Sequence, residues 1–405
     1  MGNAYNQWIR IAVLNLLLVA VLGFIMRYKI VFSLPWVHQK HILHAHSHFA
    51  FSGWITQLLM IFMVAGFTGP EQTLRRYTPI FKANLLTAYG MLLSFPFQGY
   101  GWLSISCSTA SILVSYWFAW QFWSDIKRQQ PIAGNWFKAA LLFLVMSSLG
   151  AFGLSFMMAN HWVNQAWYLA SVYFFLHFQY NGWFFFACMG LLFTLLGKYP
   201  QVIRYQSTIF RLFALACVPA YFLSVLWLSL PLWAYLLIAT AALAQVVGCW
   251  LLFRMLLGAW PYCTKDWPVL ARRTAALCFL ALVIKLLLQL LSTIPALSDL
   301  AFGFRPIVIG YLHLVLLGII SLFLLTVLQL FPQPPSAFLL RKGVVVFVCS
   351  IAANEVLLML QGLCAMFYIV VPYIQEALLL VALGLLTGAA MIFFSFRKPV
   401  RPGRV

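Results

Sequence analysis

Long apolar runs constrain the fold of this chain more than any other feature of its sequence. A helix that crosses a lipid bilayer needs about 20 predominantly apolar residues. Proline, glycine or charged residues separate the runs, as in "TGPEQTLRRYTP", and no connection is long enough for a soluble domain. The sequence therefore predicts one all-α, polytopic integral membrane domain over residues 1–405. It contains twelve such runs, at approximately 11–33, 41–67, 80–98, 101–124, 136–160, 164–196, 207–229, 231–256, 271–294, 304–331, 341–369 and 372–396.

The distribution of charge supports this class and predicts an orientation. The chain is 64% hydrophobic and 8% charged, a balance that excludes a soluble globular protein. Its net charge is +19, but the basic residues stand singly or in pairs between apolar runs, so we expect no nucleic-acid binding. Twenty of the 25 Lys and Arg residues fall in the two tails and in the connections after runs 2, 4, 6, 8 and 10. The positive-inside rule then places both termini in the cytoplasm.

A histidine followed five residues later by glycine recurs three times, at His48–Gly53, His177–Gly182 and His313–Gly318. The copies fall in runs 2, 6 and 10, which are the second members of three groups of four. We therefore expect quasi-repeats at about 1–130, 131–260 and 261–405, arranged around a pseudo-threefold axis. The three imidazoles are expected about 12–20 Å below the outer ends of their helices.

Two interpretations of these membrane-embedded histidines stay open. Neutral imidazole is a good axial ligand for haem iron and a good ligand for copper, which makes His48, His177 and His313 candidate metal ligands. Alternatively, each ring hydrogen-bonds a neighbouring helix and only supports packing. His44 and His46, which precede the first copy, are further candidate ligands, or candidate hydrogen-bond donors to haem propionates.

Two charged residues lie well inside predicted spans. Lys285 in run 9 and Glu355 in run 11 are each about thirteen residues from the cytoplasmic ends of their helices. Because unpaired charge is costly in a bilayer, we expect them to form an intramembrane pair that fixes helix packing or couples transport.

The topology and the positions of the histidines resemble subunit I of the haem–copper oxidase superfamily. The string "HAHSHFAFSGW" and, more loosely, "YLHLVLLG" are similar to segments of the NnrS family and of short subunit-I-like proteins. The resemblance implies a bacterial inner-membrane protein with haem as cofactor, of unspecified type, with copper as a second candidate cofactor. By position it implies haem ligation by His48, or His46, together with His313. It also implies copper at His177, and Arg305 is a candidate partner for a haem propionate.

The chain departs from the family pattern in the part that reduces oxygen. The tenth helix of the family carries two histidines in an H-x-H arrangement, and here Tyr311 stands in the first of those places. Residues 207–256 contain no histidine, so the usual copper site cannot be assembled. The resemblance therefore implies a haem protein of electron-transfer or nitric oxide and oxygen ligand chemistry without a complete oxygen-reducing centre. Whether the chain is an enzyme stays open.

Its expected partners are the lipid bilayer, a cytochrome or quinol electron donor, and other membrane subunits. Two further functions remain as alternatives. One is a transporter with a histidine-lined path for a metal or small molecule. The other is a non-catalytic scaffold or assembly subunit.

Overall fold

The computed structural model describes residues 3–68, 71–129, 133–197, 199–228, 230–331 and 336–396, which form helices and no β-strand. Three segments are π-helices (η1, η2 and η4) and one is a 3-10 helix (η3). In chain order the elements are α1 (Asn3–Val31), α2 (Gln39–Phe49), η1 (Ala50–Thr56), α3 (Gln57–Thr68), α4 (Glu71–Gln98), α5 (Trp102–Gln129), α6 (Gly134–Ala159), α7 (Gln165–His177), η2 (Phe178–Phe184), α8 (Phe185–Leu196), α9 (Pro200–Cys217), η3 (Pro219–Val225), α10 (Leu232–Cys263), α11 (Val269–Leu291), α12 (Pro295–Gly303), α13 (Arg305–His313), η4 (Leu314–Ser321), α14 (Leu322–Leu330), α15 (Ala337–Met366) and α16 (Ile374–Ser395).

Ten helical stretches in the described ranges are long and apolar enough to cross a membrane, and the count is eleven if α9 and η3 form one bent span. This confirms the prediction of a polytopic helical membrane protein. The stretch α4 is 28 residues long but is not among the ten, and it carries Lys82, Asn84 and two internal prolines. The predicted run 7 is not one straight helix. It is interrupted where α9 ends and η3 begins, at a bend of 46° beside Pro219.

Three spans form the centre of the bundle, and they are the three that carry the repeated histidines. Of the most apolar window of each span, 89% of residues are buried in Gln39–Gly66, 72% in Gln165–Leu196 and 50% in Arg305–Leu330. The corresponding share is 39% or less in the other seven spans. Each central span consists of an α-helix, a π-helix and a second α-helix in continuous succession.

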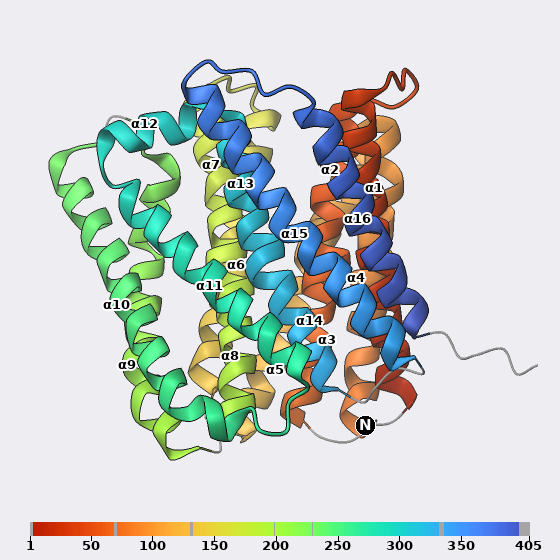
Figure 1. Ribbon diagram of the computed structural model, residues 1–405, viewed down its shortest axis with the longest axis vertical. Coiled ribbons are helices and arrows are strands. Elements are labelled where there is room, and N and C mark those ends of the chain that lie inside the picture. The colour runs from red at the N-terminus through yellow and green to blue at the C-terminus, as the bar shows by residue number, and fades with distance from the viewer. Residues whose placement is uncertain are drawn as a thin grey trace, which may run out of the picture.

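The remaining helices pack around the centre as three arcs, each of which connects two central spans. The arc α4, α5 and α6 runs from α2 to α7, and the arc formed by α9 with η3, α10 and α11 runs from α7 to η4 and α14. The third arc joins the two ends of the chain, because α1 packs on α2 and α16, and α15 packs on α16 and α13. Figure 1 shows this third arc, with red α1 beside blue α16.

Candidate functional site

Each repeated histidine is followed directly, or after one residue, by a π-helix that contains the repeated glycine. Gly53 lies in η1, Gly182 in η2 and Gly318 in η4. A π-helix adds one residue to a helical turn and is rare in proteins, where it occurs most often at functional sites. Its occurrence at the same place in three central spans gives the H-x4-G pattern a structural meaning that the sequence alone did not reveal.

Two equivalent hydrogen bonds join the π-helices across the centre. Trp183 Nε1 in η2 donates to Thr56 Oγ1 at the end of η1, over 3.3 Å, and Trp54 Nε1 in η1 donates to Ser321 Oγ at the end of η4, over 3.0 Å. In both bonds the tryptophan is the sixth residue after its histidine and the hydroxyl is the eighth. The same type of hydrogen bond therefore joins the first central span to each of the other two, at equivalent positions along the helices.

His46 lies in the central span Gln39–Gly66 and His313 in the central span Arg305–Leu330. They are close enough to interact electrostatically, although His46 is on α2 and His313 ends α13. The Nδ1–H group of His46 donates to the carbonyl of Val19 over 3.1 Å, and that of His313 donates to the carbonyl of Ile309 over 2.8 Å. A carbonyl oxygen can only accept, so each ring carries its proton on Nδ1 and presents the lone pair of Nε2.

The surroundings of this histidine pair come from the third arc. Arg27 of α1 is half-buried and close enough to His313 to interact with it electrostatically. Gly23, one turn earlier on α1, lies against the His46 ring, where a Cβ atom would be 3.4 Å from Cε1. Both imidazoles keep part of their surface accessible inside the bundle. The pair therefore combines two Nε2 atoms without a hydrogen-bond partner among the described residues, one nearby cation, and a glycine packed against one of the rings.

His48, the first member of the repeated pattern, faces a different arc. Its Nε2 atom lies 3.2 Å from the hydroxyl of Tyr100, and its ring stacks on Phe95 of α4 at 4.5 Å between centroids. Tyr100 lies in the turn between α4 and α5, and burial raises the pKa of its phenol to about 12. His44 packs against the same two aromatic rings, and its buried Nε2 atom has no hydrogen-bond partner in the described residues.

His177 is fully buried and both of its ring nitrogens are occupied. Nε2–H donates to the carbonyl of Cys217 over 2.9 Å, and Nδ1 accepts from Nδ2 of Asn181 over 3.1 Å. Cys217 ends α9 at the bend that precedes η3, and a bend in a membrane helix leaves backbone groups that neighbouring side chains must satisfy. His177 thus stabilises this bend, and neither nitrogen is free for a metal.

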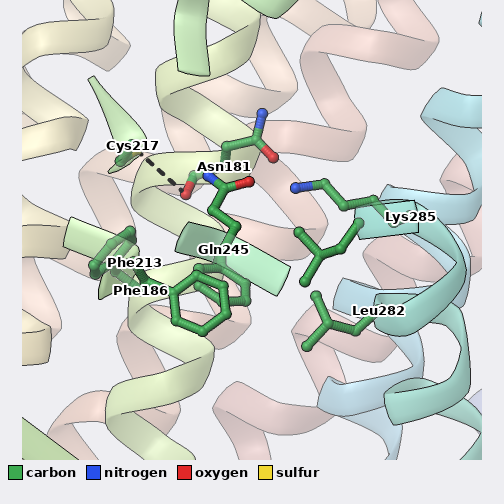
Figure 2. Close-up of a pocket in the computed structure, with 9 residues that line it drawn as sticks. Asn181, Phe186, Phe213, Cys217, Gln245, Leu282 and Lys285 are labelled. Atoms are coloured by element: carbon green, nitrogen blue, oxygen red, sulfur yellow. Dashed lines mark hydrogen bonds between the residues drawn. The ribbon is translucent and has the colours of Figure 1, made fainter. Parts of the chain in front are cut away.

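Lys285 and Glu355 do not form the expected pair. Lys285 is 6% exposed and lines a cavity of about 10 Å³, the size of one water molecule. Figure 2 shows its amine pointing toward the side-chain amides of Asn181 and Gln245. Glu355 instead accepts a hydrogen bond from its neighbour Asn354, and the ion pair found in the described ranges joins two other residues. Similar depth in the membrane did not place the two charges on facing sides of their helices.

Arg305, predicted as a propionate partner, begins α13 and is exposed. Within the part of the chain that the structure describes, no group of three or more His, Cys, Asp or Glu side chains is arranged to hold a metal ion. The arrangement that remains is a pair of imidazoles from two central spans, His46 and His313, within electrostatic range of each other. A scan against models of known protein families and a search of curated protein sequences found no match for this chain.

Proposed function

We propose that this chain is a haem-binding integral membrane protein of the haem–copper oxidase type, with one haem between His46 and His313. The observation that carries the proposal is the matched state of the two rings: each donates Nδ1–H to a backbone carbonyl and leaves Nε2 free. Metal-bound histidines characteristically make this second hydrogen bond, which fixes the ring and raises its basicity.

The arrangement of helices supports the same site. Helices α2, α1, α16, α15 and α13 pack in succession, so His46 and His313 lie on the two end helices of a five-helix arc. The arcs and the three π-helices also favour twelve spans in three pseudo-threefold groups of four, with α4 and the α9–η3 pair completing the count. The positive-inside rule supports a position of the histidine pair in the outer half of the membrane, and the proposed location is a bacterial inner membrane.

The residues of the chain fit a haem in three respects. The Nε2 atoms of His46 and His313 would hold the iron, Arg27 would place positive charge near His313 for an acidic haem side chain, and the missing Cβ of Gly23 lets α1 pack against the His46 ring. A haem bound by these two residues would supply a one-electron iron couple. The carbonyls of Val19 and Ile309 hold the rings in position for it.

The proposed role is electron transfer rather than oxygen reduction. Tyr311 stands where the related proteins carry a second histidine, and the hydrogen bonds of His177 occupy the nitrogen that would bind copper. The residues of this chain therefore do not fit a copper site at His177. A cytochrome or a quinol is the proposed electron donor.

The test is the optical spectrum and haem content of the purified chain and of single variants. We expect a Soret band in the native protein, and a haem content that falls at least about tenfold in His46→Ala and in His313→Ala, because ligand loss costs more than loss of an outer partner. His48→Ala is the matched control from the same helix and should keep its haem. Absence of a Soret band in the native protein, or full haem content in His46→Ala, would refute the proposal. Metal uptake into vesicles by the haem-free protein would favour the transporter alternative.

A further inference from the structure

We propose that a groove between the first halves of α1 and α4 binds one anionic phospholipid, with its phosphate on Arg75 and Lys82. The groove encloses about 530 Å³, within the range of small-molecule sites. Trp8 and Ile11 line it from α1, and Leu85 continues its wall on α4. It lies at the opposite end of α1 from Arg27, so it is separate from the histidine pair.

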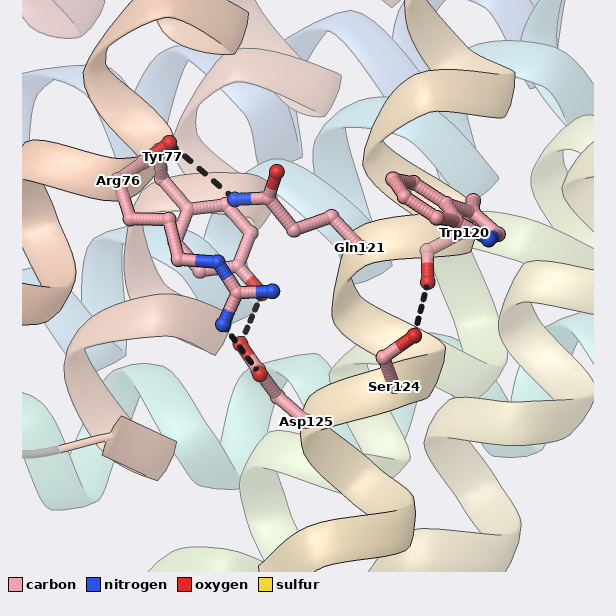
Figure 3. Close-up of polar contacts among 6 residues, drawn as sticks. All are labelled: Arg76, Tyr77, Trp120, Gln121, Ser124 and Asp125. Carbon is pink, nitrogen blue, oxygen red and sulfur yellow. Dashed lines mark hydrogen bonds and ion pairs between the residues drawn. The ribbon is translucent and has the colours of Figure 1, made fainter.

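The two basic side chains of the groove have no acidic partner in the described part of the chain. Figure 3 shows the adjacent Arg76 directed toward α5, where its guanidinium binds Asp125 over 2.7 Å and Tyr77 donates to the same carboxylate over 2.5 Å. That carboxylate is therefore already satisfied by α4 itself. Arg75 and Lys82 both line the groove, whose lining contains no Asp or Glu. Both side chains are exposed, so an anion from outside the chain can reach them.

Along α4 the groove is lined by Arg75, Thr78 and Lys82 and then by Leu85, so its far end is apolar, as in a phospholipid, although Leu74 also lines the end beside Arg75. Arg75 and Lys82 are seven residues apart on one face of α4, which separates their Cα atoms by about 10 Å along the axis. Leu85 and Ile11 extend the wall on the far side of Lys82, and Trp8 is the kind of residue that lies at the boundary between head groups and hydrocarbon. A free phosphate would use only the polar end, whereas a lipid uses both.

The position in the membrane also favours a lipid. Basic residues are concentrated at this end of the bundle, which the positive-inside rule assigns to the cytoplasmic leaflet. That leaflet carries the anionic lipids, and basic pockets between membrane helices at this level bind their head groups.

Native mass spectrometry of the full-length protein, released from bilayers of phosphatidylcholine with a minority of phosphatidylglycerol, tests the site. We expect the native chain to retain one phosphatidylglycerol. The double variant Arg75→Gln/Lys82→Gln should bind it about thirtyfold more weakly, the factor expected for two basic side chains near an anionic lipid. The control Lys127→Gln/Arg128→Gln removes the same charge from the exposed end of α5 and should bind normally.

Two further arms separate the possible outcomes. Arg75→Lys/Lys82→Arg keeps the charge and should retain the lipid, which distinguishes a lost site from a misfolded protein. Inorganic phosphate in excess should not displace the lipid. Equal retention by the Gln variant, equal loss in the α5 control, or displacement by phosphate alone would each overturn the proposal.

Discussion

The buried amine of Lys285 allows a quantitative prediction about stability. In Lys285→Met the chain keeps a side chain of similar length and loses the charge. A lysine at the centre of a membrane helix costs about 2.5–3.5 kcal/mol on insertion scales, and the structure gives Lys285 no carboxylate partner in the described residues to offset this cost. The substitution removes that cost. It also leaves the side-chain amides of Asn181 and Gln245, toward which the amine points, facing an apolar side chain, and polar interactions of this kind average about 0.6 kcal/mol each in a membrane protein. We therefore expect Lys285→Met to be more stable by about 1–2 kcal/mol.

The assay is reversible unfolding in mixed micelles with increasing denaturing detergent, followed by far-ultraviolet circular dichroism. Lys127→Met is the control, because Lys127 is exposed at the end of α5 and its loss should change stability by less than about 0.5 kcal/mol. A destabilisation of Lys285→Met by more than about 1 kcal/mol would refute the reasoning, because it would mean that the amine makes an interaction stronger than its desolvation cost.

Two other predictions concern the packing of the π-helices. Trp54→Phe and Ser321→Ala should show a coupling free energy of about 0.6 kcal/mol, and no more than about 1.7 kcal/mol, in a double-mutant cycle by the same assay; additive effects would mean that the hydrogen bond contributes nothing. Gly182→Ala should destabilise by about 1–3 kcal/mol, because its Cβ atom would lie 2.5 Å from that of Phe143. Gly258→Ala, with no atom within 4 Å of the added Cβ, should be neutral or stabilising, and an equal loss at both glycines would contradict the packing argument.

The sequence predicted the helical class and the recurrence of histidine in three spans, because both depend on features that a linear pattern carries. That these three spans form the centre of the bundle was not predicted. Apolar length decides which segments enter a bilayer, and the H-x4-G spacing is visible in one dimension. The π-helices were not predictable in this way, because the extra residue in each turn arises from tertiary packing and leaves no distinctive residue type.

The spacing of the histidines in "HAHSHF" does not reveal which of them lies near His313. His46 and His48 are two positions apart on one helix, about 200° in rotation, so they face different arcs. The repeat pattern favoured His48, whereas the pairing with His313 belongs to His46. Rotation about the helix axis also explains why Lys285 and Glu355 do not pair. A similar depth in the membrane is necessary for an ion pair, but the two side chains must also point toward each other.

The repeated tryptophan contact is missing at one of three seams. Where η4 and η2 would form the third copy, the chain has Ile319 and Phe185, whose side chains cannot hydrogen-bond. Dispersion forces between side chains depend weakly on sliding, whereas a hydrogen bond depends strongly on distance and angle. Of the three contacts between central spans, the two with a hydrogen bond therefore resist sliding, and the third, where the chain has Ile319 and Phe185, allows it more easily. Any rocking between the central spans should take place along that seam, and the lysine-lined cavity at its edge would change shape first.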